Sequence, residues 1–254
     1  MTTQKLLAPF RKALLDYKMI NDGDRIAIGL SGGKDSLTLL QLFAAYKRFA
    51  PEKFELCAVH IDMGLDEIGL AVDENEKNAM ADFCYDNKIE LIVEKTQTAA
   101  IIFRDRKETN PCSLCAKLRR GALNSKCVEL GCNKLALGHH KDDLVETFFL
   151  SMFYEGRLAT FSPQSYMSRT AITLIRPMIY IDEKNISAYA KHLPILNNPC
   201  PQNHIGCREY MKNMIKSIQK DIPFAKERIF SAIISPERYN LFDKFVKDIE
   251  EIKK

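Results

Sequence analysis

Short apolar segments alternate with helix-forming segments along most of the chain. The apolar segments have the length and composition of buried strands and lie at residues 25–30, 54–62, 90–94, 134–137 and 174–180. Apolar residues recur at helical spacing elsewhere, so helices are expected over residues 5–18, 37–43, 67–87 and 182–190, and after residues 111 and 138. Strands that alternate with helices indicate an α/β fold with a doubly wound parallel sheet.

The last part of the chain changes to a helical pattern alone. Residues 205–222 place their apolar side chains on one helical face, and Ser235 and Pro236 are the cap and first-turn residues of a further helix. We therefore expect an N-terminal helix over residues 1–20, an α/β domain over residues 21–195 and a helical C-terminal segment over residues 196–254.

A glycine-rich turn joins the first predicted strand to the helix that follows it. Backbone N–H groups at such a helix start are unpaired and the helix dipole is positive there, so the turn binds phosphate well. Glycines let an anion approach closely, and a lysine adds a mobile charge. The alternative is an ordinary strand-to-helix turn. The candidate phosphate ligands are Ser31, Gly32, Gly33, Lys34, Asp35 and Ser36.

This turn is not a Walker A loop, because Gly29 and Gly33 enclose too few residues and Asp35 follows Lys34. The carboxyl ends of neighbouring parallel strands form the ligand crevice of an open α/β sheet. The second strand ends at His60, Ile61 and Asp62, which we expect beside the phosphate loop. For the side chain of Asp62, capping the next turn is an equally good interpretation.

A group of acidic residues begins the helix after the fourth predicted strand. Asp142, Asp143 and Glu146 follow Gly138 and a pair of histidines. Carboxylates at a helix start complement its dipole, and they can also hold Mg²⁺ against nucleotide phosphates. If they served only the dipole, the histidine pair would have no explanation.

Two cysteines separated by two residues lie at the start of another predicted helix. Cys112 and Cys115 can face one metal atom or cluster, and the helix start is expected to lower their pKa toward thiolate. A zinc site would need more ligands, and neither Cys127 with Cys132 nor Cys200 with Cys207 has zinc-finger spacing. A structural zinc stays possible but lacks ligands.

Composition limits the class of protein. The chain has 254 residues, of which 46% are apolar, enough for a full core, and its net charge is +4. No run approaches the roughly 18 apolar residues of a membrane span, and the N-terminus lacks a secretory signal. We expect a cytoplasmic protein without a membrane partner, whose eight cysteines are thiols or metal ligands.

Basic residues lie at two places where they could bind nucleic acid. Arg119 and Arg120 follow the cysteine pair. Cations also recur every fourth residue along the helix predicted over residues 205–222, where they could follow a phosphate backbone or simply form a solvated face. These cations are Arg208, Lys212, Lys216 and Lys220.

Three motifs resemble those of one enzyme family. The Ser31 to Ser36 turn is similar to the pyrophosphate loop of PP-loop ATP pyrophosphatases, whose fold is that of the adenine nucleotide alpha hydrolases. With the cysteine pair, Arg119 and Arg120, and residues 138–156, it resembles the TtcA/TtuA-type tRNA thiolation enzymes, closest to the tRNA 2-thiocytidine synthetases. The motifs are spread between about residues 20 and 230.

The resemblance implies a reaction and its participants. ATP would adenylate the C2 oxygen of an anticodon-loop cytidine of tRNA, at position 32, and sulfur would then displace AMP. Lys34, Asp35, Asp142, Asp143 and Cys200 would be catalytic, with Mg²⁺ on the phosphates. His60, Ile61, Asp62, Gly138 and Asp143 would bind the nucleotide. The resemblance also implies a sulfur donor, such as a cysteine desulfurase or inorganic sulfide, and a homodimer.

The same resemblance implies a 4Fe-4S cluster held by Cys112, Cys115 and Cys200, with one open iron to carry sulfur. This chain departs from the family pattern near Cys200, because Asn197 stands where an earlier cysteine is usual and Pro201 follows. Cys207 is an additional thiol. The zinc-finger cysteine pairs of the 2-thiouridine branch are absent from the sequence.

Two other classes of function remain open at this point. One is a PP-loop enzyme that holds structural zinc and adenylates another substrate. The other is a cluster-bearing redox or tRNA-binding protein without catalytic activity.

Overall fold

The computed structural model describes residues 1–70, 72–106, 111–197, 199–200 and 207–238. The strands are β1 (Arg25–Gly29), β2 (Glu55–Asp62), β3 (Glu90–Lys95), β4 (Lys134–Ala136), β5 (Gln164–Met167) and β6 (Ile172–Ile175). The α-helices are α1 (Thr3–Asp16), α2 (Lys34–Lys47), α3 (Glu74–Asp86), α4 (Pro111–Glu129), α5 (Lys141–Glu155), α6 (Glu183–Tyr189), α7 (Cys207–Asp221) and α8 (Ala225–Ile233). Shorter helical turns are η1 (Asp66–Ile68), η2 (Ala100–Asp105), η3 (Ala190–His192) and η4 (Pro236–Arg238).

The strands form one sheet in the order β3-β2-β1-β4-β6-β5. All neighbours are parallel except β5, which pairs antiparallel with β6 at the edge. The chain starts at β1, moves outward to β3 and then returns to β4 on the other side of β1. This reversal confirms the predicted doubly wound α/β fold. In such folds, ligands bind beyond the carboxyl ends of the strands at the reversal point, which here lies between β1 and β4.

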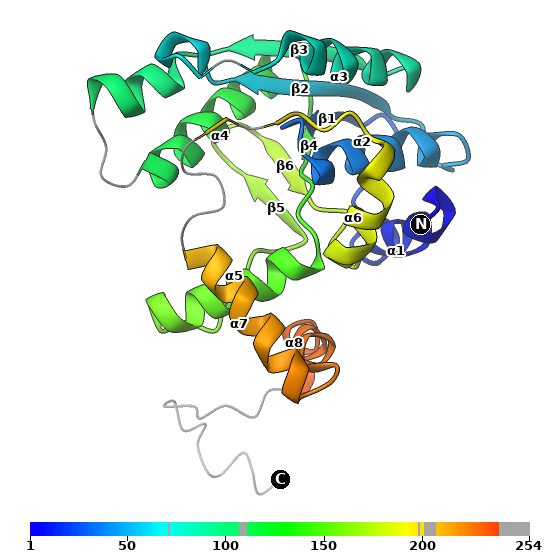
Figure 1. Ribbon diagram of the computed structural model, residues 1–254. Coiled ribbons are helices and arrows are strands. Elements are labelled where there is room, and N and C mark those ends of the chain that lie inside the picture. Colours follow the sequence, from blue (N-terminus) through cyan, green and yellow to red (C-terminus); the bar gives the residue numbers. More distant parts are fainter. Residues whose placement is uncertain (71, 107–110, 198, 201–206, 239–254) are drawn as a thin grey trace, which may run out of the picture.

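Successive side chains along a strand point to opposite faces of the sheet, so the sheet has an apolar core on each face. Ile26 and Ile28 of β1 pack with α1, α2, α3 and α6, whereas Ala27 between them packs with Leu123 and Cys127 of α4. Figure 1 shows α4 on one side of the sheet and α1, α2 and α6 on the other. Because β1 is buried on both faces, it reads in the sequence as a continuous apolar run.

The three helices α5, α7 and α8 build a separate apolar cluster that extends the sheet domain (Figure 1). The cluster contains Leu144, Val145, Phe149, Met211, Ile215 and Phe230. The predicted apolar face of α7 is thus confirmed for Met211 and Ile215. The predicted division into three parts is not tested by this packing and stays a prediction.

Several predicted elements differ from the observed ones. The helix expected over residues 67–87 begins only at Glu74, because Gly69 (φ +78°) ends the preceding short turn and Asp73 caps the new helix. The strand expected over residues 174–180 ends at Ile175, just before Arg176 and Pro177, and a proline cannot donate to a sheet.

Among the described strands and α-helices, the edge strand β5 and helix α8 have no counterpart in the predicted elements, and neither does the helical turn η2. The final helix predicted from Ser235 is a short 3₁₀ turn at Pro236–Arg238, and the rest of that prediction lies outside the described residues. Across the described part of the chain, no helix has the length and apolar character needed to cross a bilayer.

Candidate active site

The phosphate loop is preformed by its own hydrogen bonds. Ser36 Oγ accepts from Ser31 N at 3.1 Å and donates to the carbonyl of Gly33 at 3.0 Å. Gly33 is the N-cap of α2, and Gly32 has φ +79°. A Cβ at position 32 would also lie 2.6 Å from Leu196 Cδ1, so glycine is required here on two grounds.

Lys34 is held at the mouth of this loop by two carboxylates. Its Nζ lies 3.2 Å from Asp35 Oδ2 and 3.2 Å from Glu183 Oε1. Burial opposes the charge of Lys34, but the two carboxylates outweigh it and raise its pKa. Lys34 therefore stays protonated and faces the crevice as a cation.

Glu183 joins Lys34 to a second lysine. Lys212 Nζ donates to Glu183 Oε1 at 2.7 Å. Burial alone would raise the pKa of Glu183, but Lys212 and Lys34 lower it to about 2. Sequence reasoning missed Glu183 as a site residue, although its place in the first turn of a predicted helix was a signal.

The acidic helix start lies against the phosphate loop, as predicted. A Cβ on Gly138 would come within 3.0 Å of the backbone of Asp35, so glycine allows the two turns to touch. His140 caps α5 in a capping box, in which His140 N donates to Asp143 Oδ2 at 3.0 Å and Asp143 N donates to His140 Nδ1 at 3.4 Å. The second histidine of the pair thus has a structural role.

The two aspartates of this group have different surroundings. Asp142 is fully engaged by the protein, because Lys226 Nζ donates to Oδ1 at 2.6 Å and Glu183 N donates to Oδ2 at 2.7 Å. Asp143 Oδ1 instead accepts from the half-exposed Arg208 at 2.8 Å. Asp142 therefore joins α5, α6 and α8, whereas Asp143 is held by the start of its own helix and by Arg208 of α7.

Asp35 supplies an unsatisfied oxygen beside Asp143. Its Oδ1 is buried with no hydrogen-bond partner among the described residues, and its nearest ionic neighbour, His140 Nε2, is 3.7 Å away. His140 Nε2 is also 3.4 Å from Asp143 Oδ2. Mg²⁺ is usually held by one or two carboxylates together with water and phosphate oxygens, so the carboxylates of Asp35 and Asp143 are of the type that it binds.

A third carboxylate lies deeper in the same place. Glu146 is buried, and its Oε2 is 3.9 Å from Arg208. Burial, followed by the charge of Asp143, raises the pKa of Glu146 to about 7. This side chain can therefore exchange a proton near neutral pH.

The end of β2 lies beside the phosphate loop. His60 Nδ1 is 2.8 Å from the carbonyl oxygen of Leu30, so it carries the proton, and burial lowers the pKa of the ring. Asp62 Oδ1 accepts from Gly64 N at 3.0 Å, which is the capping role considered from the sequence. Ile61 is buried. Nucleotide binding by these three residues stays a prediction.

Cys112 and Cys115 lie in the first turns of α4, as predicted. Cys115 Sγ is 3.5 Å from Met63 Sδ, just past the end of β2. Burial raises the pKa of Cys115, and the charges of Cys200 and Cys112 act on it in the same direction. The expected lowering toward thiolate is therefore wrong for Cys115, because burial outweighs the lowering effect of the Arg119 charge. Cys115 thus lies near enough to Cys112 and Cys200 for their charges to act on it.

The arrangement of these thiols does not match a single-ion site. Within the described ranges, no three His, Cys, Asp or Glu side chains are spaced to hold one metal ion. A zinc ion would need its sulfurs about 2.3 Å from one centre. An iron–sulfur cluster binds its cysteine thiolates on different iron atoms, so its cysteines need not converge on one centre.

Cys200 reaches the crevice because the segment before it packs on the phosphate loop. Leu196 N donates to Gly32 O at 3.0 Å, and Asn197 N donates to Glu76 Oε2 at 2.7 Å. Cys200 is half-buried. The additional thiol, Cys207, opens α7 and contacts Tyr154 of α5.

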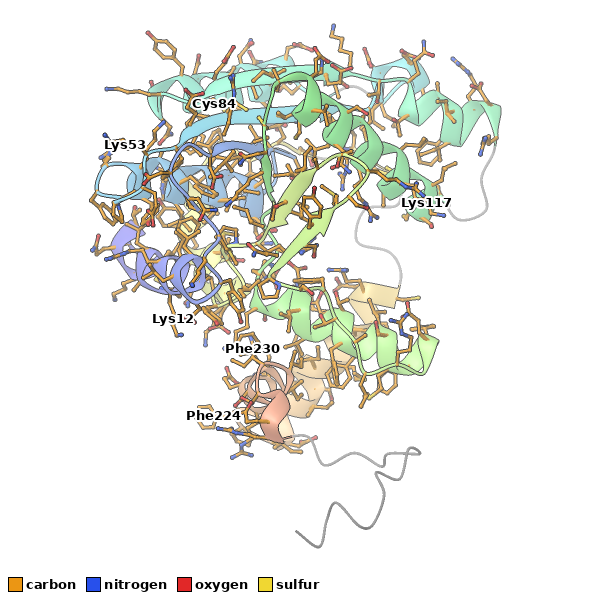
Figure 2. All side chains as sticks on the ribbon, turned by 180° about the vertical axis from the view of Figure 1, so that it is seen from behind. Lys12, Lys53, Cys84, Lys117, Phe224 and Phe230 are labelled. Carbon is orange, nitrogen blue, oxygen red and sulfur yellow. The ribbon has the colours of Figure 1, made fainter. Side chains whose placement is uncertain are left out.

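The predicted nucleic-acid residues divide into two groups. Arg119, Arg120, Lys216 and Lys220 are exposed, and Figure 2 shows the neighbouring Lys117 on the outside of α4. Arg208 and Lys212, in contrast, pair with carboxylates of the site. The four-residue repeat on α7 therefore serves the crevice at its first two positions and reaches solvent at its last two.

A buried arginine in the crevice was missed from the sequence. Arg176 NH1 donates to Ser162 O at 2.5 Å, and its Nε donates to His139 Nδ1 at 3.3 Å. Burial, followed by the charge of Arg120, lowers the pKa of Arg176 to about 10. Burial also lowers the pKa of His139 to about 4, so that ring is neutral and can accept.

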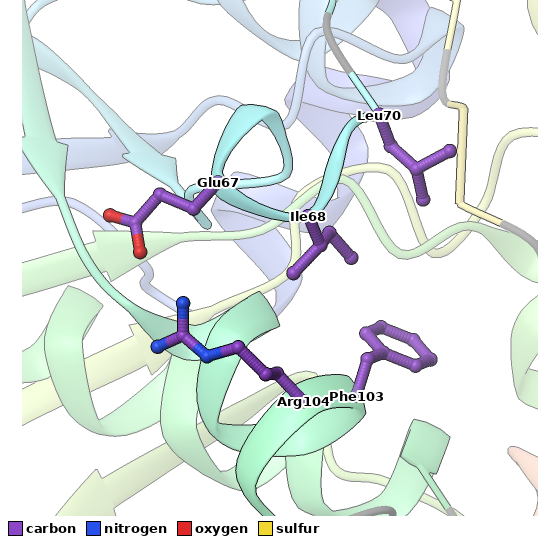
Figure 3. Close-up of a pocket in the computed structure, with 5 residues that line it drawn as sticks. All are labelled: Glu67, Ile68, Leu70, Phe103 and Arg104. Atoms are coloured by element: carbon purple, nitrogen blue, oxygen red, sulfur yellow. The ribbon is translucent and has the colours of Figure 1, made fainter.

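An open pocket of about 450 Å³ lies beyond the ends of β2 and β3 (Figure 3). Its walls come from η1, η2 and the residue after the η1 turn. The lining residues are Glu67, Ile68, Leu70, Phe103 and Arg104. It was not predicted from the sequence.

Comparisons with known proteins agree with this geometry. A family model described as a PP-loop domain matches residues 3–218. A tRNA-cytidine(32) 2-sulfurtransferase from Syntrophotalea carbinolica is 39% identical over 242 residues, or 93% of this chain and 91% of that protein. One from Geotalea daltonii is 36% identical over 245 residues, 93% of each chain.

Among solved structures, the U34-tRNA thiolase NcsA from Methanococcus maripaludis, determined with its 4Fe-4S cluster, has a TM-score of 0.73. Its sequence is 24% identical, and the match covers 95% of this chain and 80% of that one. At this identity the likeness shows a shared fold.

Proposed function

We propose that this protein uses ATP to replace the C2 oxygen of cytidine 32 of tRNA with sulfur. The basis is its family, because the chain belongs to the PP-loop family and, within it, to the tRNA-cytidine(32) 2-sulfurtransferases. The observation that carries the proposal is the meeting of a phosphate loop, an acidic helix start and three thiols at one end of the sheet. If the protein were instead a PP-loop enzyme that holds structural zinc and only adenylates its substrate, Cys200 would have no role.

ATP activates an oxygen that otherwise leaves poorly. The C2 oxygen of cytidine attacks the α-phosphorus, pyrophosphate departs, and the oxygen then leaves as part of AMP. The N–H groups at the start of α2 and the cation of Lys34 neutralise charge that grows on pyrophosphate. Glu183 positions Lys34 through their 3.2 Å ion pair.

Asp35 and Asp143 are the residues that would hold Mg²⁺, because Asp35 Oδ1 is buried without a donor and Asp143 Oδ1 is held by the half-exposed side chain of Arg208. Bound there, the ion would neutralise phosphate charge. Arg208 now bonds Asp143 Oδ1, so it would have to release that oxygen when the ion binds. Asp142 keeps a positioning role through Lys226.

Cys112, Cys115 and Cys200 would hold the 4Fe-4S cluster, with one iron left open. When bound, the cluster would supply the position from which sulfur reaches the activated carbon. The sulfur itself would come from inorganic sulfide or a cysteine desulfurase. The packing of Leu196 on Gly32 keeps the Cys200 segment next to the phosphate loop. We also propose a homodimer, as implied by the family resemblance.

The tRNA backbone would lie along the exposed cations of α4 and α7. Changing Lys216→Gln should weaken tRNA binding equally for all sequences and reduce the slope of log affinity against log salt by about 1. Titrations of labelled tRNA at several salt concentrations measure this slope. Lys53→Gln, two residues before β2 and on another side of the molecule (Figure 2), is the control and should leave the slope unchanged. An unchanged slope for Lys216→Gln would remove α7 from the tRNA site.

The proposed function is tested by thionucleoside analysis. Anaerobically purified protein is incubated with tRNA, ATP, Mg²⁺ and sulfide, and the tRNA is digested and analysed by mass spectrometry for 2-thiocytidine. Cys200→Ala should abolish thiolation yet retain ATP binding, whereas Cys207→Ala should thiolate normally. Thiolation that survives in Cys200→Ala refutes the three-cysteine assignment.

Metal analysis of the same samples tests the cluster separately. The unchanged protein should contain about four irons and four acid-labile sulfides per chain, and Cys200→Ala should lose them. Zinc without sulfide would instead support a PP-loop enzyme that adenylates a different substrate.

A further inference from the structure

Two buried cysteines face each other on the side of the sheet covered by α4. Cys57 Sγ and Cys132 Sγ are 3.6 Å apart, and both side chains are buried. Cys57 lies on β2 opposite Ala27, and Cys132 lies in the turn between α4 and β4. The chain positions are 75 residues apart, so only the fold brings these thiols together.

These thiols are separate from the proposed cluster site. Cys57 is near the start of β2, whereas the site occupies the other end of that strand around Asp62 and Met63. Cys132 follows the last residue of α4, whereas Cys112 and Cys115 are at the first turns of that helix. The pair therefore has no part in the proposed reaction.

A metal ion does not explain the pair. Cys127 of α4 packs in the same core, but the described residues contain no group of three ligands spaced for one ion. Buried cysteines can pack merely as small apolar side chains. That role does not require their two sulfurs to meet, and here each thiol is the hydrogen-bonding partner of the other.

We propose that Cys57 and Cys132 are a disulfide site, closed by hydrogen peroxide and reopened by a dithiol. The sulfur atoms would need to approach by about 1.5 Å to reach the S–S bond length of about 2.05 Å. Cys132 is in a turn whose neighbours, Gly131 and Asn133, are both exposed, so a small movement of this turn admits peroxide.

The reaction balances with peroxide as the only oxidant. The Cys132 thiolate attacks a peroxide oxygen, the O–O bond breaks, and a sulfenic acid forms at Cys132 with release of water after proton transfer. The Cys57 sulfur attacks the Cys132 sulfur, gives up its proton, and expels a second water. Two thiols are oxidised by two electrons, and peroxide is reduced to water.

The surroundings favour Cys132 as the attacking thiol. The hydrogen bond from Cys57 and, after the opposing effect of burial, the guanidinium of Arg25 lower the pKa of Cys132. The same contact and burial raise the pKa of Cys57. The thiolate form is thus favoured on Cys132, the residue in the surface turn.

Closing the bond would clamp β1 from both sides. Cys57 is on the strand to one side of β1, and Cys132 lies two residues before the strand on its other side. A link between residues so far apart in the chain restricts the unfolded chain. Oxidised protein should therefore melt at a higher temperature than reduced protein, while the end of the sheet that binds ATP stays open.

Peptide mapping of the unchanged full-length protein tests the proposal directly. Anaerobically purified protein is exposed to peroxide, remaining thiols are alkylated in denaturant, and the digest is analysed by mass spectrometry with and without reduction. Trypsin leaves Cys127 and Cys132 in one peptide, between Lys126 and Lys134. A second cleavage after Glu129 separates them and assigns the bond.

The expected product joins the Cys57 peptide to the Cys132 peptide and disappears on reduction. Cys132→Ala should lose both this product and the rise in melting temperature on oxidation. Cys84→Ala is the matched control, because Cys84 is a buried cysteine of α3 in the core on the other face of the sheet (Figure 2). It should behave like the unchanged protein.

Three results would overturn the proposal. One is complete alkylation of Cys57 and Cys132 after oxidation, and another is a bond from Cys132 to Cys127 in place of Cys57. The third is a rise in melting temperature that persists in Cys132→Ala. None of these bears on thiolation, so the outcome is independent of the proposed function.

Discussion

Replacing Glu183 with glutamine should measure how strongly the Lys34–Glu183–Lys212 network supports the fold. Glu183 is only 19% exposed, and Lys212 and Lys34 lie 2.7 and 3.2 Å from its Oε1. Its pKa in the folded protein is about 2, against a usual 4.5. That difference corresponds to about 3 kcal/mol of stability at neutral pH.

The sign of the pH dependence follows from the lowered pKa. A carboxylate with a lowered folded-state pKa stabilises the protein above its unfolded-state pKa and loses this effect as the pH falls through the folded value. Glu183→Gln should therefore unfold with about 3 kcal/mol less free energy at pH 7. The gap between the two proteins should shrink to about 1.4 kcal/mol near pH 3.

Urea denaturation of both proteins across this pH range is the assay. Glu74→Gln is the control, because Glu74 also pairs with a lysine at 2.7 Å but its side chain is 76% exposed. That change should lower the free energy of unfolding by less than about 0.5 kcal/mol. If Glu183→Gln has the same effect at pH 3 as at pH 7, the stabilisation is not electrostatic and the reasoning fails.

Two further changes probe the crevice. Gly32→Ala should weaken ATP binding at least about tenfold, or about 1.4 kcal/mol, because the added Cβ would displace Leu196 and strain the loop. Calorimetry measures this loss. Gly69→Ala is the control, because Gly69 also has a positive φ but has open space around it, and this variant should bind ATP normally. Lys226→Met should lower the free energy of unfolding in urea by about 3 kcal/mol, because the carboxylate of Asp142, only 15% exposed, would lose its 2.6 Å partner. A loss under about 1 kcal/mol would contradict this.

Local patterns were sufficient for the phosphate loop and the order of the elements. A strand, two glycines and a lysine before an apolar helix form the same turn in any surroundings, because the geometry depends on adjacent residues. The edge strand β5 was missed since its residues alternate between exposed and half-buried positions and carry no apolar run. The late start of α3 depended on a glycine with positive φ that the pattern does not reveal.

The cations of α7 show that helical spacing predicts which side chains share a helix face but not what those side chains contact. Their spacing puts Arg208, Lys212, Lys216 and Lys220 on one side of a helix, whatever surrounds it. Which of them meets a carboxylate depends on how α7 packs against α5 and α6. The first two pair with Asp143 and Glu183, and the last two remain exposed.

The phosphate loop, the acidic helix start and the cysteine pair could be predicted from the sequence alone because each lies within one short stretch of chain, and the α/β fold followed from the alternation of such stretches. The contacts of Glu183 with Lys34, of Lys226 with Asp142 and of Cys57 with Cys132 became known only from the folded structure. The last two contacts join positions 84 and 75 residues apart. Contacts of this kind arise from the packing of whole elements, and no local pattern of residues specifies them.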